Sequence, residues 1–387
     1  MIMANHSRGR QTMTTPTLAQ TLDALTADGE LSERHADGAV TCLACGHRCL
    51  IRPGRRGICR VRFNEAGRLR VPWGYVGALQ CDPTEKKPFF HLLPGSDTLT
   101  FGMLGCDLHC GYCQNWITSQ ALRDPASEAA GAHPLTVTPR RLIDVALRDG
   151  AQVVGSSYNE PLITTEWAAA VFREAVAAGL KCAYISNGNA TPEALDHLQP
   201  YLTAYKIDLK TMSDRNYRRL GAVLENVLDG LRWVHARGLW LEVVTLIVPG
   251  FNDSDAELRD AAAFIHSLSP DIPWHVTAFH EDYKMAGPEY RRTTARLLLR
   301  AAGLGREAGL RYVYAGNLPG QVGDFESTFC PRCGTRLVER YGYMLLSYRL
   351  TAQGNCPECE TPVAGVWTSR PETVRLLGPG RPRRPGL

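Results

Sequence analysis

The chain has 387 residues and a formal net charge of +4, with 44% hydrophobic and 21% charged residues. This balance is typical of a globular protein and excludes a disordered or collagen-like chain. Lysines and arginines are spread along the sequence rather than gathered with aromatic residues, which argues against nucleic-acid binding. The first residues lack the apolar core of a secretory signal, and no stretch approaches about 20 consecutive apolar residues. We therefore expect a cytoplasmic protein without a membrane span.

Cysteine is the most informative residue type in this sequence. Most of the 13 cysteines fall into three compact groups, and only Cys81 and Cys182 stand apart. In a reducing compartment, such groups are better explained as metal ligands than as disulfides. The groups also divide the chain into an N-terminal, a central and a C-terminal part.

Residues 1–35 are predicted to be a flexible N-terminus, and residues 36–96 a cysteine module with a lead-in to the next domain. The cysteines of the module are Cys42, Cys45, Cys49 and Cys59. Four thiolates suit either a zinc ion or an auxiliary iron–sulfur cluster, because both accept four cysteines. We favour zinc slightly over the cluster, and either metal centre over free buried thiols. His47 is an alternative metal ligand, but its presence in the segment is better explained as a turn residue.

Between Thr98 and Gly316, short β-prone runs alternate with helical segments. This alternation predicts an α/β fold with parallel strands and crossover helices, a partial (βα) barrel over residues 97–318. Six or seven strands are expected, at 98–103, 152–156, 182–186, 204–208, 241–248, 274–279 and 311–314. In such a barrel the chemistry lies at the carboxyl ends of the strands, so the loop after each strand is the place to look for a site.

The first strand leads directly into a loop with three closely spaced cysteines. They are Cys106, Cys110 and Cys113, with the spacing C-x3-C-x2-C. Three thiolates can hold three irons of a cubane cluster, which leaves the fourth iron open to a cofactor or substrate. The alternatives are a zinc site that borrows a ligand such as His109, or three unconnected core thiols. The spacing and the position after a strand favour the cluster.

The stretch from Gly105 to Asn115 resembles the cluster-binding signature of radical S-adenosylmethionine (SAM) enzymes, in particular the branch of pyruvate formate-lyase activating enzymes. The resemblance implies an oxidoreductase in which a 4Fe-4S cluster cleaves SAM reductively. The resulting 5′-deoxyadenosyl radical would abstract hydrogen from a substrate. A reductant such as flavodoxin or ferredoxin would supply the electron, and no side chain beyond cluster and cofactor is expected to be catalytic.

Polar segments after the later strands resemble the parts of this family that contact SAM. Tyr158-Asn-Glu-Pro161 stands where the family has Gly-Gly-Glu-Pro, which gives Glu160 a contact to the methionyl amine. The two missing glycines are a departure from the family pattern. Each segment alone is equally well explained as a turn, and their order after the cysteines favours the site. The residues expected to bind SAM are Tyr112, Asn159, Glu160, Ser186, Asn187, Asp208, Lys210 and Asn252.

A finer resemblance covers nearly the whole chain. The segments 82–88, 158–161 and 312–317 resemble the radical SAM enzyme of the AmmeMemoRadiSam system. This resemblance implies a bacterial or archaeal enzyme with Memo-like and AMMECR-type proteins as partners. It does not identify the substrate.

Residues 319–370 carry two C-x2-C pairs separated by 22 residues. The cysteines are Cys330, Cys333, Cys356 and Cys359. They resemble a zinc ribbon with structural zinc, in which the β-prone run 341–348 forms the intervening hairpin. Such a module could dock a partner protein. Residues 371–387 are expected to be a flexible basic tail.

The leading hypothesis is reductive cleavage of SAM and hydrogen abstraction from an unknown substrate held in the mouth of the barrel, with a small molecule or peptide as one interpretation of that substrate. An alternative is an activase that creates a radical on a glycine of a partner enzyme. A third hypothesis, from another class, is an electron-transfer or zinc scaffold protein, which leaves the barrel pattern and Glu160 unexplained.

Overall fold

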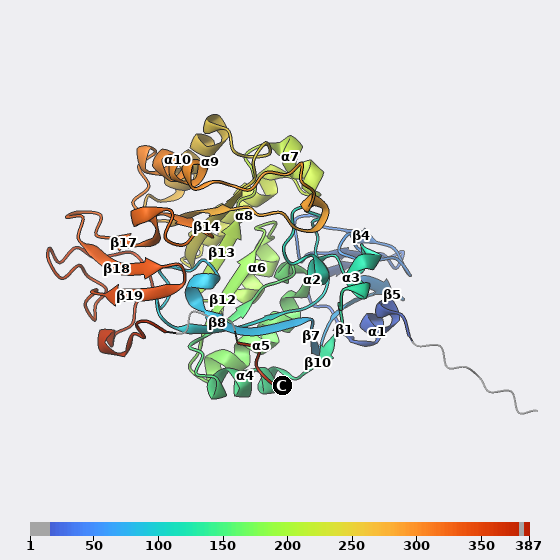
Figure 1. Ribbon diagram of the computed structural model, residues 1–387. Helices are drawn as coiled ribbons and strands as arrows, with labels where there is room; N and C mark the ends of the chain where they lie inside the picture. The colour runs from blue at the N-terminus through green and yellow to red at the C-terminus, as the bar shows by residue number, and fades with distance from the viewer. Residues whose placement is uncertain (1–15, 379–382) are drawn as a thin grey trace, which may run out of the picture.

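A mostly parallel sheet forms the centre of the molecule (Figure 1). The structure is a computed structural model and describes residues 16–378 and 383–387. The strand order is β16-β15-β14-β13-β12-β11-β9-β8, and only β8 (Ala78–Pro83) at one edge runs antiparallel to its neighbour. The parallel strands are β9 (Asp97–Gly102), β11 (Val153–Ser156), β12 (Lys181–Ser186), β13 (Ala204–Asp208), β14 (Trp240–Ile247), β15 (Trp274–Ala278) and β16 (Val313–Gly316).

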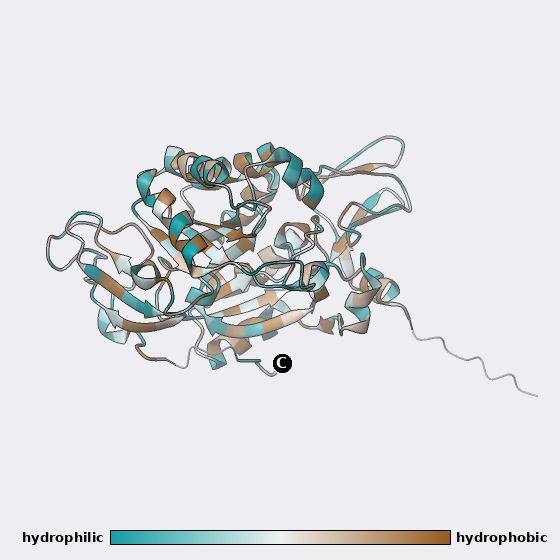
Figure 2. Ribbon diagram, turned by 45° about the horizontal axis from the view of Figure 1, so that its top comes forward, coloured by the Kyte–Doolittle hydropathy of each residue, from teal (hydrophilic) through white to brown (hydrophobic). Residues whose placement is uncertain are grey.

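The predicted α/β class is confirmed, and all seven expected strands are present with ends that shift by two residues at most. The order of β9 to β16 in the sheet follows their order in the chain, as expected of a repeated βα unit. Within the described residues, the end strands β8 and β16 do not pair with each other, so the barrel is partial. Strands β9, β11 and β15 are buried at every position, because helices or loops cover both faces. Figure 2 shows hydrophobic residues on strands at the centre of the molecule and both hydrophilic and hydrophobic residues on the helices around them.

The crossovers are mainly helical. Thr138 caps the first of them as expected, since its hydroxyl accepts a hydrogen bond from a backbone N–H of the first turn. Ser254 caps α9 in the same way, but the Glu257 carboxylate accepts the N–H of Met212 at 2.9 Å instead of completing a capping box. The crossover helices are α4 (Pro139–Arg148), α5 (Thr165–Ala177), α6 (Pro192–Leu198), α7 (Asp214–Leu220), α8 (Leu224–Ala236), α9 (Asp255–Leu268) and α10 (Ala295–Glu307), with short helices α2 (Trp116–Ser119) and α3 (Pro125–Ala129) before them.

The N-terminal part is folded from α1 (Leu18–Ala24) onward. Two antiparallel sheets follow, in the orders β1-β6-β5 and β2-β3-β4. The predicted flexible segment 1–35 therefore needs correction, because residues 18–34 form a helix and two paired strands; residues 1–15 lie outside the described part. The strands are β1 (Thr26–Asp28), β2 (Ser32–Arg34), β3 (Val40–Cys42), β4 (Leu50–Ile51), β5 (Phe63–Glu65) and β6 (Arg68–Pro72), and β7 (Tyr75–Val76) pairs with β10 (Leu135–Thr136).

The C-terminal cysteines lie on a small sheet of the order β17-β18-β19. Its strands are β17 (Thr328–Phe329), β18 (Arg336–Tyr341) and β19 (Met344–Tyr348). The predicted hairpin run 341–348 thus covers the turn and the second strand. Figure 1 shows this sheet on one side of the barrel and the N-terminal module on the other.

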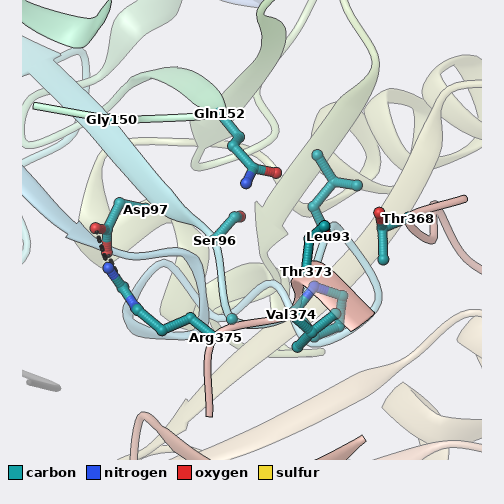
Figure 3. A pocket seen from close by; sticks show the side chains of 11 residues that line it. Leu93, Ser96, Asp97, Gly150, Gln152, Thr368, Thr373, Val374 and Arg375 are labelled. Atoms are coloured by element: carbon teal, nitrogen blue, oxygen red, sulfur yellow. Dashed lines mark hydrogen bonds and ion pairs between the residues drawn. The ribbon is translucent and has the colours of Figure 1, made fainter. Parts of the chain in front are cut away.

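The basic tail is held on the sheet in its described residues, contrary to the expected flexible tail over 371–387. Figure 3 shows Arg375 against Asp97 beside a cavity of about 160 Å³. The Arg375 guanidinium donates to both Asp97 carboxylate oxygens, at 2.7 and 2.9 Å. Arg383 also reaches Asp97, at 2.5 Å, and its backbone bonds to Cys81 of β8. Within the two described ranges, no helix is long and apolar enough to cross a membrane.

Candidate active site

The carboxyl ends of the central strands surround a cavity of about 360 Å³. Loops after β9 and β11 and the ends of β12 and β13 contribute its walls. The predicted residues that line it are Cys106, Cys110, Cys113, Tyr112, Asn159, Glu160, Ser186, Asn187, Asp208 and Lys210. The structure therefore brings the three central cysteines together with seven of the eight residues expected to bind SAM.

The three central cysteines favour the neutral thiol, because their pKa values are raised. A nearby cation would be needed to stabilise them as thiolates. Burial raises the pKa of Cys110 to about 12 and also raises the pKa of Cys106 and Cys113. A backbone N–H of Leu108 donates to the Cys106 sulfur at 3.4 Å, and the Ser119 hydroxyl lies 3.2 Å from the Cys113 sulfur. Metal binding would displace the thiol protons, and these polar groups would stabilise the sulfur charge.

The spacing of the three sulfurs disfavours a single zinc ion. Zinc holds thiolates at about 2.3 Å, so the sulfurs of one zinc site lie roughly 3.8 Å apart. Among residues 16–378, the central cysteines do not form a group with ligand atoms within 4.8 Å of one another. The ring of His109 packs beside Gly221 and lines a different cavity, away from the three sulfurs. The donor set fits a multi-iron cluster instead.

Glu160 is held in place by three hydrogen bonds. Its carboxylate accepts from the Ser186 hydroxyl at 2.7 Å, from the Asn187 N–H at 2.7 Å and from the Leu162 N–H at 3.1 Å. Burial is the largest influence on this group and raises its pKa to about 8. A bound ammonium group would favour the ionised carboxylate, because an opposite charge nearby lowers a carboxyl pKa.

The two residues that replace the family glycines keep a glycine-like backbone at the first position. Tyr158 has φ of +68°, in the left-handed region that favours glycine. Its hydroxyl lies 2.8 Å from the Lys87 ammonium, and the next residue, Asn159, accepts the N–H of Met103 at 3.0 Å. The backbone at Tyr158 is thus one that glycine adopts readily, while the side chains of Tyr158 and Asn159 make contacts that glycines could not make.

Asp107 is a buried member of the site that sequence reasoning missed. Its side chain has no exposed surface, and its carboxylate accepts from the side-chain amides of Asn187 at 2.7 Å and Asn189 at 2.8 Å. It lies beside Cys106, with 3.8 Å between a carboxylate oxygen and the sulfur. The one available signal was an acidic residue directly after a ligand cysteine in an otherwise apolar loop.

Lysines from two segments also face the cavity. Lys206 and Lys210 flank Asp208, and each ammonium contacts one oxygen of its carboxylate. Lys87 donates to Asp82 at 2.6 Å, and burial lowers the pKa of Lys87 to about 8. The segment 82–88, singled out in the sequence, therefore supplies part of the cavity wall.

Asn252 does not line the cavity. Its amide accepts the N–H of Val248 at 2.7 Å and donates to the carbonyls of Lys210 at 2.7 Å and Leu246 at 2.8 Å. All its polar groups are used to fix the loop after β14. The structure thus places this residue behind the lining rather than in it.

A second cavity of about 520 Å³ adjoins the first. The two share Pro88, Gln114, Thr277, Asn317 and Tyr343 as lining residues. The second cavity extends between the barrel and the β18–β19 hairpin, and its size suits a small molecule or the end of a peptide.

The C-terminal cysteines form a compact four-sulfur group. All four ligand atoms lie within 4.8 Å of one another, with 3.5 Å between Cys330 and Cys359 and 3.6 Å between Cys333 and Cys356. These distances fit the edge of a tetrahedron around one zinc ion, about 3.8 Å. The predicted pairing of the two C-x2-C knuckles is thus present, and it fits zinc or iron.

The N-terminal cysteines also surround one region, but more loosely. Cys42, Cys45 and Cys59 are buried, and Cys49 is half-buried. Burial raises the pKa of Cys59 to about 12, and the neighbouring Cys42 raises it further. His47 points elsewhere, with Nε2 3.8 Å from the Asp107 carboxylate.

Comparison with known proteins identifies the family. A model of the radical SAM superfamily matches residues 101–265. An uncharacterized protein of Methanocaldococcus jannaschii is 36% identical over 313 residues, which cover 80% of this chain and 90% of that protein. An isethionate sulfite-lyase activating enzyme of Oleidesulfovibrio alaskensis is 25% identical over 186 residues, which cover 46% of this chain and 59% of that enzyme.

Among solved structures, a domain of pyruvate-formate lyase-activating enzyme from Bacteroides vulgatus is similar, with a TM-score of 0.38 and 18% identity over 42% of this chain and 98% of that chain. The family match spans β9 to α9 and includes the three central cysteines and Glu160. The family implies a 4Fe-4S cluster and SAM, and its enzymes generally need a reductant. On these matches, the chain belongs to the radical SAM superfamily.

Proposed function

We propose that this chain cleaves SAM reductively in the cavity of about 360 Å³ and abstracts hydrogen from a substrate in the adjoining cavity. The observation that carries the proposal is the convergence of three buried thiols and the Glu160 carboxylate on one cavity. Cys106, Cys110 and Cys113 would hold the cluster. When bound, the cluster supplies the electron that cleaves SAM to methionine and a 5′-deoxyadenosyl radical.

The chain's own residues position the cofactor. Glu160 is fixed by three donors and would bind the methionyl ammonium, because its carboxylate is already oriented and shielded from water. Lys210 and Asp208 offer both charges at the next strand end. The remaining proposed contacts are Tyr112, Asn159, Ser186 and Asn187, and Asn252 would act by fixing its loop.

The proposed division of labour follows the segments predicted from the sequence. Residues 97–318 would carry the reaction, with the module 36–96 and the ribbon-like segment 319–370 attached to it. The substrate would be a small molecule or peptide in the cavity of about 520 Å³. Because the segment 82–88 carries the finer family resemblance and lines the site, we extend the proposal to Memo-like and AMMECR-type partners. We also propose a cytoplasmic location, because clustered free thiols suit a reducing compartment.

A second candidate is activation of a glycyl radical enzyme. Similarity to the isethionate sulfite-lyase activating enzyme, 25% identical over 186 residues, supports it. This candidate requires a partner protein whose glycine becomes a stable radical. Electron paramagnetic resonance on mixtures with candidate partners separates the two, since only the activase leaves a protein radical.

The test is 5′-deoxyadenosine formation by the anaerobically reconstituted chain with SAM and dithionite. The parent and a Cys182→Ala variant, which changes a buried thiol outside the three groups, should form the product. A variant with Cys106, Cys110 and Cys113 changed to alanine should form none. Glu160→Gln should weaken SAM binding about 10- to 100-fold, because it removes a charge-assisted contact. Product from the triple variant, or none from a parent with a loaded cluster, would contradict the proposal.

A further inference from the structure

We infer that Cys42, Cys45, Cys49 and Cys59 hold a 4Fe-4S cluster, which takes electrons from an acidic carrier protein and passes them to the site of Cys106, Cys110 and Cys113. The identity of this metal centre does not depend on the proposed function, but the electron relay does. Sequence alone leaves zinc and a cluster open, with a slight preference for zinc. The structure separates them by sulfur spacing, surroundings and position.

The sulfurs of the N-terminal and C-terminal cysteines differ in their spacing. Within the described residues, the C-terminal cysteines form a four-sulfur group within 4.8 Å, whereas Cys42, Cys45, Cys49 and Cys59 do not form even a three-sulfur group of that size. One zinc ion needs the tighter arrangement, while four separate irons hold their thiolates further apart. The central cysteines, which belong to the family's cluster segment, also lack the tight arrangement. The N-terminal group therefore resembles the cluster site rather than the zinc-sized site.

The surroundings of these sulfurs suit a cluster. The N–H of Ile58 donates to the Cys49 sulfur at 3.5 Å, and Cys59 accepts backbone N–H groups of Val61 and Arg62. Such donors stabilise the charge of a cluster and tune its potential. Cys42, Cys45 and Cys59 are each 5–6% exposed, which protects a cluster from water and oxygen.

The module is joined to the active-site loop by direct contacts. The guanidinium of Arg123 donates to the carbonyl of Ile58 at 3.0 Å and to that of Cys106 at 3.2 Å. On the other side, the Asp107 carboxylate lies 3.8 Å from His47 and 3.8 Å from the Cys106 sulfur. Arg123 and Asp107 thus each bridge the two cysteine-bearing loops. Zinc has no redox chemistry, whereas a cluster at this place can pass an electron to the active site.

The outer face of the module offers a place for electrons to enter. Arg52, Arg55 and Arg60 are exposed on one loop, where Ile58 is 48% exposed, while Arg56 of the same loop pairs with Asp23. A cavity of about 810 Å³ beside this loop reaches Cys49. An exposed apolar residue among positive charges fits an acidic one-electron carrier, because complementary charge speeds encounter.

The relay is a balanced electron transfer. The carrier loses one electron, the N-terminal cluster gains it, and the cluster then returns to its oxidised state as the electron moves to the active-site cluster. No bond is formed or broken in the module and no proton is required. Reductive cleavage of SAM then consumes the electron.

Metal analysis of the full chain tests the identity of the centre. The anaerobically purified parent should hold about eight irons and one zinc, and the Cys106→Ala, Cys110→Ala, Cys113→Ala variant about four irons and one zinc. That variant should give an iron–sulfur resonance after reduction, without any SAM cleavage. Two zinc ions in the parent, or no iron in the variant, would overturn the inference. The parent count does not depend on whether any variant folds.

Reduction kinetics test the relay. In Arg52→Glu, Arg55→Glu, electron delivery by a flavodoxin at low salt should slow about tenfold, while delivery by dithionite should not change. Arg336→Glu on the opposite side of the barrel is the control and should match the parent. Equal rates with flavodoxin, or an equal loss with both reductants, would overturn the electron-entry face while leaving the metal count to decide the cluster.

Discussion

The two outer cysteine groups have the same number of thiols but are built in different ways. The C-terminal sulfurs stand ready at zinc-like distances on a small sheet, and Cys333 is exposed. Three of the four N-terminal cysteines are buried, their sulfurs do not form a group within 4.8 Å, and Arg123 links their loop to the loop of Cys106. The number and spacing of cysteines in a sequence therefore do not determine which metal they bind. The fold around them sets the distances between sulfurs.

The two groups are also attached to the barrel differently. The N-terminal module is held by a buried ion pair between Arg62 and Glu166, which are 1% and 2% exposed. The C-terminal sheet is held by a larger buried network, in which Tyr314 links Thr328 at 2.8 Å to His91 at 2.6 Å. The buried Arg340 guanidinium also donates to the carbonyl of Phe90 at 2.7 Å and lies 3.8 Å from the Glu85 carboxylate. The His91 Nδ1 must carry the proton, because its partner is the carbonyl of Ala364.

The largest effect is expected from the C-terminal cysteines, for which we propose a zinc ion. Changing Cys330 and Cys356 to serine should release one zinc ion and unfold the β18–β19 hairpin, since structural zinc in small modules contributes about 10 kcal/mol or more. Hydrogen exchange over residues 336–348 and zinc content measure this loss. Iron content and exchange over β9 to β13 should stay as in the parent. A fall in iron would contradict the separate roles of the two groups.

A smaller effect is expected at the N-terminal attachment. Arg62→Met leaves the buried Glu166 charge without its partner, so the free energy of unfolding should fall by about 3 to 5 kcal/mol. Urea denaturation measures the change. The matched control is Arg48→Met, which breaks an exposed pair with Glu193 and should cost less than about 1 kcal/mol. Similar costs for the two variants would show that the buried pair does not anchor the module.

The smallest expected effect is a difference between the two attachments in how their contribution to stability depends on pH. Burial lowers the pKa of His91 to about 4, below the ordinary value of 6.5. The unfolded chain therefore binds a proton first as pH falls, and stability is lost between about pH 6.5 and pH 4. We expect a loss of about 2 kcal/mol between pH 7 and pH 5. His91→Gln should remove this part of the pH dependence of unfolding. If the free energy of unfolding of the variant changes with pH as steeply as that of the parent, His91 is not the group responsible.

The N-terminal attachment should be insensitive to pH between pH 7 and pH 5, because its titrating group is a carboxyl with a lowered pKa. The Arg62 guanidinium and other contacts outweigh burial and lower the pKa of Glu166. Its contribution is therefore lost only as pH falls below the ordinary carboxyl range.

The sequence predicted the parts of the fold that depend on local pattern. Strands β11 and β15 are buried at every position, and their β-prone composition marks them directly. Cys106 and Glu160 follow strands in recognisable segments. Asp107 could not be recognised, because its role depends on Asn187 and Asn189, about 80 residues away in the chain. The sequence also did not predict that residues 18–34 and the tail are folded, since both depend on pairing with distant segments.

The left-handed backbone at Tyr158 has a consequence for how the cavity meets its ligands. A glycine there would relax more easily, but it would lack the hydroxyl that joins Lys87 to the loop after β11. That contact ties two walls of the cavity together before any ligand arrives. A mobile wall would lose conformational entropy when a ligand binds. Here that entropy is already lost on folding, so the entropic cost of binding is smaller and the affinity is higher.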